Sequence, residues 1–92
     1  MSRGDISLGR RIRTSTAAQP HFPVFIDTVE DAIDHVQELP RQVADRSHWI
    51  AARDALWQAS DDPMDYAKIK AADAALCRAL AAEGWLNDLK PF

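Results

Sequence analysis

The 92-residue sequence has a single cysteine, only three glycines and no long apolar run. One cysteine excludes an intrachain disulfide framework and a cysteine-rich zinc site. No stretch approaches the roughly 20 apolar residues of a membrane-spanning helix, and the first residues lack the apolar segment of a secretory signal. Arginine exceeds lysine by eight to three and alanine is abundant, as in GC-rich bacterial genomes. We therefore predict a small soluble bacterial protein of the cytoplasm with no membrane partner.

Sequence motifs of catalysis are also scarce. There is no Gly-rich phosphate loop, dinucleotide fingerprint or paired-carboxylate pocket. Ser47, His48 and Asp54 supply the residue types of a hydrolase triad, but no strained elbow or oxyanion loop accompanies them. We predict no catalytic residue and no bound cofactor, and hence a protein that is not an enzyme.

Metal-dependent activity is an alternative hypothesis for one acidic segment. Asp27, Asp31 and His35 are spaced four residues apart, so in a helix they would share one side. A carboxylate and an imidazole one turn apart can bind a transition metal. A solvated acidic helix face explains the same pattern, and we predict no metal ligands.

Charge is distributed unevenly along the chain. Residues 22–92 carry a net charge of -6, whereas residues 1–21 carry +3. We interpret residues 1–20 as a flexible basic arm and residues 21–92 as one small helical domain. The acidic domain argues against a nucleic-acid partner, but the arm makes nucleic-acid or regulatory binding an alternative function. Its basic residues are Arg3, Arg10, Arg11 and Arg13.

Hydrophobic periodicity predicts a strand and a first helix. Residues 22–27 contain apolar residues at period two, which favours a short strand, with residues 6–13 as its one possible partner within the chain. Thr28 is a good N-cap, and an apolar stripe at helical spacing follows it as far as Leu39. Pro40 ends this helix.

Two further helices follow a polar connection at residues 40–46. One is predicted from about Asp45 or Ser47 to Ala59. The other begins after Asp62, with Pro63 as its first residue, and ends at Glu83 before a left-handed Gly84. The fold is thus mainly α, with three helices preceded by a short N-terminal strand or β-hairpin; the alternative is an α+β fold with a two-stranded sheet. The core is predicted to contain Val29, Ile33, Val36, Trp49, Leu56, Ile69, Leu76 and Leu80.

Aromatic residues give the one positive indication of function. The second helix is apolar over a wider arc than one core contact needs, because Trp49, Ile50 and Trp57 lie on different sides of it. Together with Phe22 and Phe25, they are the candidate interaction surface. We predict a non-enzymatic protein-interaction module that binds an unknown protein or itself as a homodimer.

Three segments also resemble a known family. The sequences FPVFIDTVEDAIDHV, WIAARDALWQA and AADAALCRALAAEGWL are similar to a small uncharacterised domain family of soil and plant-associated alphaproteobacteria, over about residues 22–86. The resemblance implies a short N-terminal hairpin or strand followed by three helices. This chain lacks the Gly-turned hairpin of that family. The family has no established activity, so the resemblance implies a fold and no function.

Overall fold

A β-hairpin begins the part of the chain that the structure describes. This computed structural model describes residues 6–18 and 21–86. Strand β1 (Ser7–Arg13) pairs antiparallel with β2 (Phe25–Thr28), with Ile12 opposite Ile26. Residues 7–13 therefore form a strand, and the prediction of a flexible arm is wrong for this stretch. The physical reason is that β1 buries Leu8 and Ile12 in the core.

In the described part of the chain, four α-helices follow the hairpin. A short 3-10 helix (Thr16–Ala18) lies between the strands, and β2 leads directly into α1 (Val29–Gln37). Helix α2 (Arg41–Ala44) lies where a polar connection was predicted, so the prediction of three helices missed this single turn. The two long helices are α3 (Ser47–Asp61) and α4 (Tyr66–Glu83).

The helix ends follow their capping residues, with one correction. The Thr28 hydroxyl accepts a hydrogen bond from the Asp31 backbone N–H at 3.1 Å, as predicted for an N-cap. Helix α4 begins three residues later than predicted, because its N-cap is Asp65 and not Asp62. The Asp65 side chain accepts hydrogen bonds from backbone N–H groups of the first turn. Gly84 ends α4 with a φ of 76°, as predicted for a left-handed C-cap.

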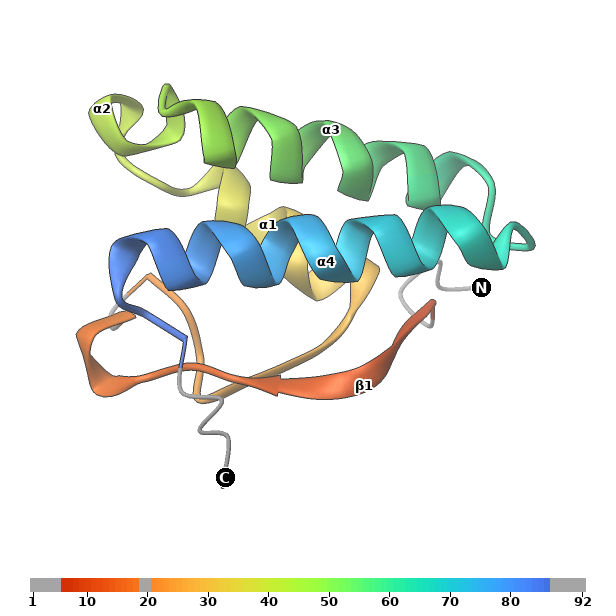
Figure 1. Ribbon diagram of the computed structural model, residues 1–92, viewed down its shortest axis with the longest axis horizontal. Helices are drawn as coiled ribbons and strands as arrows, with labels where there is room; N and C mark the ends of the chain where they lie inside the picture. Colours follow the sequence, from red (N-terminus) through yellow and green to blue (C-terminus); the bar gives the residue numbers. More distant parts are fainter. Residues whose placement is uncertain (1–5, 19–20, 87–92) are drawn as a thin grey trace.

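The elements are arranged around one core (Figure 1). Helices α3 and α4 lie side by side, and α3 also packs against α1. The hairpin lies on the other side of the molecule, with β1 against α4 and β2 against α1. The prediction of a mainly α domain with a preceding hairpin is confirmed. None of the helices in the described ranges combines the length and hydropathy that crossing a bilayer requires.

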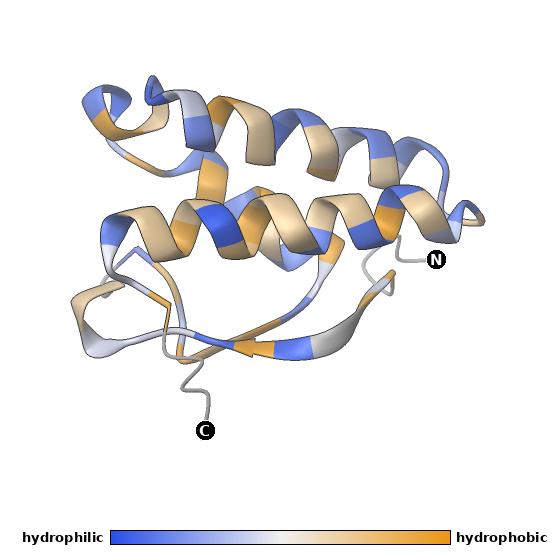
Figure 2. Cartoon of the chain, in the orientation of Figure 1, coloured by the Kyte–Doolittle hydropathy of each residue, from blue (hydrophilic) through white to orange (hydrophobic). Residues whose placement is uncertain are grey.

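Hydrophobic side chains from every layer meet in this core. Figure 2 shows hydrophilic and hydrophobic residues alternating along α3 and α4, as expected for helices with one buried side. All eight predicted core residues are buried. The hairpin and the segment before β2 contribute further buried residues that were not predicted to be in the core: Leu8, Ile12, Phe22 and Ile26.

The segment after α4 completes the hairpin. Thr14, which follows β1, forms an isolated antiparallel bridge with Leu86. The Ser15 backbone N–H donates to the Trp85 carbonyl oxygen at 2.7 Å, and the Thr14 hydroxyl donates to the Pro23 carbonyl. Residues near the two ends of the described chain therefore hold each other in place.

Candidate functional site

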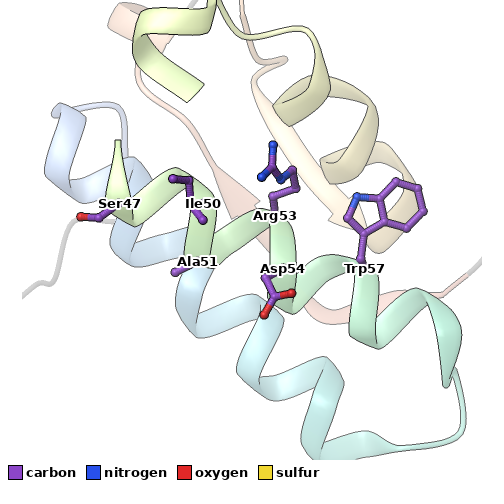
Figure 3. Close-up of a pocket in the computed structure, with 6 residues that line it drawn as sticks. All are labelled: Ser47, Ile50, Ala51, Arg53, Asp54 and Trp57. Atoms are coloured by element: carbon purple, nitrogen blue, oxygen red, sulfur yellow. The ribbon is translucent and has the colours of Figure 1, made fainter. Parts of the chain in front are cut away.

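Helix α3 presents an open groove on the side that faces away from the core (Figure 3). Its volume is about 380 Å³. We call this side the outer face of α3, and its described lining residues are Ser47, Ile50, Ala51, Arg53, Asp54 and Trp57. Figure 3 shows Ile50, Arg53 and Trp57 projecting to one side of the helix and Asp54 to the neighbouring side.

Two large apolar side chains stand on this face. Ile50 is 44% exposed and Trp57 is 39% exposed. They are seven residues apart, two helical turns, so they lie one above the other along the helix axis. The core side of α3 is occupied by Trp49, Ala52 and Leu56, so Ile50 and Trp57 have no place in the same core. The wide apolar arc predicted for this helix therefore leaves two of its members at the surface.

Two of the five predicted surface residues are instead buried. Trp49 is 1% exposed and Phe22 is 2% exposed. Their rings are stacked, with centroids 5.6 Å apart. Their assignment to the interaction surface was wrong because the segment before β2 folds under α3 and covers Trp49. Phe25, in contrast, is exposed on the hairpin.

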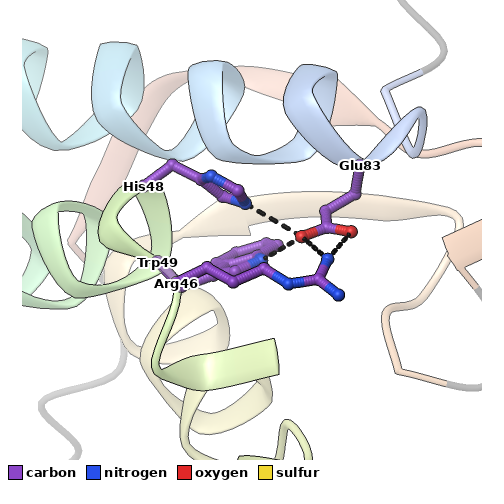
Figure 4. Close-up of polar contacts among 4 residues, drawn as sticks. All are labelled: Arg46, His48, Trp49 and Glu83. Atoms are coloured by element: carbon purple, nitrogen blue, oxygen red, sulfur yellow. Dashed lines mark hydrogen bonds and ion pairs between the residues drawn. The ribbon is translucent and has the colours of Figure 1, made fainter. Parts of the chain in front are cut away.

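The best-defined polar cluster joins the start of α3 to the end of α4 (Figure 4). The Glu83 side chain is 9% exposed. Arg46 Nη1 donates hydrogen bonds to both of its carboxylate oxygens, each at a distance of 2.6 Å. His48 Nε2 and Trp49 Nε1 lie 2.9 and 3.0 Å from Glu83 Oε2. Because an ionised carboxylate only accepts hydrogen bonds, His48 Nε2 carries a proton in this arrangement.

These contacts set the protonation of Glu83. Burial alone would raise its pKa, but the hydrogen bonds from Arg46, His48 and Trp49 and the Arg46 charge lower it from 4.5 to about 2. The carboxylate lies in the last turn of α4, where the helix dipole disfavours negative charge. The three donors at the start of α3 offset that cost. The cluster therefore acts as a clamp between two helices, and every one of its donors is engaged by the same carboxylate.

The hairpin carries a second exposed surface with a different character. The Arg11 and Arg13 guanidinium groups lie 5.0 and 5.7 Å from the centre of the Phe25 ring. Arg11 is also 3.9 Å from Asp27. Of the other two predicted basic residues, Arg10 belongs to β1 and Arg3 lies outside the described residues. The described arginines are thus held on a strand and not on a mobile arm.

The residues of the hydrolase-triad and metal-site hypotheses come together only in part. His48 is paired with Glu83, whereas Asp54 accepts a hydrogen bond from Gln58, so Ser47, His48 and Asp54 form no triad. Asp31 and His35 are 3.3 Å apart, as predicted from their spacing.

The predicted third member of the acidic stripe is placed elsewhere. Asp27 belongs to β2 and not to the helix. Within residues 6–18 and 21–86, no three His, Cys, Asp or Glu side chains are grouped so that they could hold a metal ion.

Sequence reasoning missed two carboxylates. Glu83 was considered only as the last residue of a helix, and no local signal connects it to His48, 35 residues away. Both carboxylate oxygens of Glu30 are buried and have no hydrogen-bond partner among the described residues. Glu30 lies in the first turn of α1, where the helix dipole favours a negative charge.

Comparisons with known proteins place no relative beside this chain. No protein-family model, no curated protein and no solved structure matches it. The resemblance to an alphaproteobacterial family therefore stays a prediction.

Proposed function

We propose that the protein is a non-enzymatic interaction module that binds a protein partner through the outer face of α3. The observation that carries this proposal is the exposed pair Ile50 and Trp57 at the edge of an open groove. Tryptophan side chains dominate the binding energy of many protein interfaces, because burying one removes a large apolar area from water. Neither residue belongs to the core, so the exposed apolar part of each side chain is available to a partner.

Site-specific photo-crosslinking in the cells of origin tests this proposal. A photoreactive amino acid at Ala51, an exposed position in the groove, should yield a crosslinked protein adduct. The same amino acid at Ala74, exposed on α4, is the matched control and should yield none. Trp57→Asp should abolish the adduct at position 51 while leaving the helix content unchanged by circular dichroism. Equal adducts at both positions, or none at position 51, would contradict the proposal.

Nucleic-acid binding through the hairpin is a second candidate, favoured by one observation. Arg11 and Arg13 flank an exposed Phe25 ring on the outside of a β-sheet. Proteins bind single-stranded nucleic acids with this combination of stacking ring and backbone-neutralising cations. A fluorescent oligonucleotide should bind the wild type more weakly as salt rises, and Arg11→Ala with Arg13→Ala should remove that binding. Binding that persists in the double variant would end this candidate.

A further inference from the structure

The outer face of α3 has a charge pattern that accompanies its apolar pair. Successive residues in a helix are about 100° apart, so Arg53 and Asp54 lie on opposite sides of the line from Ile50 to Trp57. Figure 3 shows these two side chains leaving the helix in different directions. Both side chains are exposed. The face thus consists of an apolar line with a cationic flank on one side and an anionic flank on the other.

This pattern selects a particular partner. From it we infer, building on the proposed function, that the occupant of the outer face is a second copy of this chain whose α3 runs parallel to the first. A twofold axis parallel to the two helices places the cationic flank of each against the anionic flank of the other. Arg53 then faces Asp54 of the partner subunit, and the symmetry generates the same ion pair twice. Ile50 and Trp57 meet their own counterparts between these pairs.

The opposite orientation is disfavoured by the same charges. In a symmetric antiparallel pair, each flank faces its own copy, so Arg53 would face Arg53 of the partner subunit. Asp54 would face a second carboxylate in the same way. Like charges in direct opposition destabilise an interface. The charge pattern therefore specifies the orientation, while the apolar pair supplies the attraction.

The size of this contact sets the expected affinity. A 15-residue helix is about 22 Å long, and one pair of such helices buries less surface than a standard stable interface. The dimer should therefore be weak and reversible, with its population rising with protein concentration. Salt should weaken it, because the two ion pairs are at the surface.

Charge reversal tests the inference by sedimentation equilibrium. Arg53→Asp and Asp54→Arg should each raise the dimer dissociation constant by about tenfold or more, because attraction becomes repulsion at both symmetric contacts. The double variant Arg53→Asp with Asp54→Arg should recover the wild-type dissociation constant. The two single variants, mixed, should form a heterodimer. Arg78→Asp on α4 and Asp34→Arg on α1 are matched controls at exposed positions and should have little effect.

Cysteine crosslinking tests the orientation. In a Cys77→Ser background, Ile50→Cys should form an intersubunit disulfide under mild oxidation, because position 50 meets position 50 of the partner subunit in the parallel pair. Ala74→Cys on α4 is the control and should not.

Three results would overturn the inference, and they can be separated from failure of the proposed function. These are a wild type that stays monomeric at millimolar concentration, single variants that dimerise like the wild type, and a double variant that fails to recover. If the chain is monomeric but position 51 still crosslinks to a different protein, the second copy is excluded and the interaction module stands. If neither dimer nor crosslink forms, both proposals fail.

Discussion

Trp49 and Trp57 belong to the same helix, eight residues apart, and have opposite environments. The Trp49 ring is stacked on Phe22, and its indole N–H donates to the Glu83 carboxylate. Trp57 lines an open groove and lies on the opposite side of α3 from the core. Residue type and helical spacing therefore do not decide which tryptophan is structural. The elements packed against each one decide it.

The two tryptophans also differ in what they contribute to stability and to association. The surroundings of Trp49 include a buried charge, a stacked ring and contacts from two other elements. Trp57 is not part of the core and lines the groove on the outer face of α3. Substitutions near Trp49 should therefore change the free energy of unfolding, and substitutions near Trp57 should change binding instead.

Replacing Trp49 should have the largest effect. Trp49→Ala leaves a cavity beside Phe22 and removes one donor to Glu83, so it should lower the free energy of unfolding by about 3–5 kcal/mol. Urea denaturation followed by circular dichroism measures this change. A loss of under 1 kcal/mol would contradict the assignment of Trp49 to the core.

Removing the charge of Glu83 should have the next largest effect. Glu83→Gln keeps the size of the side chain but weakens the hydrogen bonds from Arg46, His48 and Trp49, and we expect a loss of about 2 kcal/mol. Glu38→Gln, at an exposed position at the end of α1, is the matched control. Equal urea midpoints for the two variants would show that the clamp contributes nothing to stability.

The stability of the fold should depend on pH through the same carboxylate. The pKa of Glu83 is lowered to about 2 in the folded state from an ordinary value of 4.5. Its ionised form therefore stabilises the fold at pH values above 4.5, and this contribution is lost as the pH falls from 4.5 towards 2. Melting temperatures over this range should fall more steeply for the wild type than for Glu83→Gln. Parallel curves would contradict the lowered pKa.

Replacing Trp57 should have the smallest effect on folding. Trp57→Ala should change the free energy of unfolding by less than about 1 kcal/mol, since Trp57 is 39% exposed and is not part of the core. Quenching of tryptophan fluorescence by acrylamide should drop clearly, because the most accessible of the indoles is lost. A loss as large as that of Trp49→Ala would place Trp57 in the core and remove the basis of the interaction surface.

Local patterns were sufficient to predict most of the fold. The Thr28 cap, the stripe from Val29 to Leu39 and the left-handed Gly84 are short-range signals, and the structure follows each of them. The start of α4 was misplaced because two aspartates compete as caps, and their spacing alone does not decide between them. The strand β1 was underestimated because its burial depends on α4, far along the chain.

The candidate surface was predicted only in part, for a related reason. The helical periodicity predicted that Ile50 and Trp57 lie outside the face of the helix that packs on the core, and both are exposed. It could not show that Phe22 would cover Trp49, because β2, α1 and α2 separate these two residues along the chain. Glu83 became important only when α4 was packed beside α3.

The bridge between Thr14 and Leu86 has a consequence for synthesis of the protein. A ribosome makes the hairpin strand first and releases Trp85 and Leu86 only after both long helices have been translated. Until then, the backbone groups of Thr14 and Ser15 that face these residues have no partner from the chain. The domain should therefore acquire its final cooperative structure late in translation, and nascent chains stalled before residue 85 should be markedly more sensitive to proteases than completed ones.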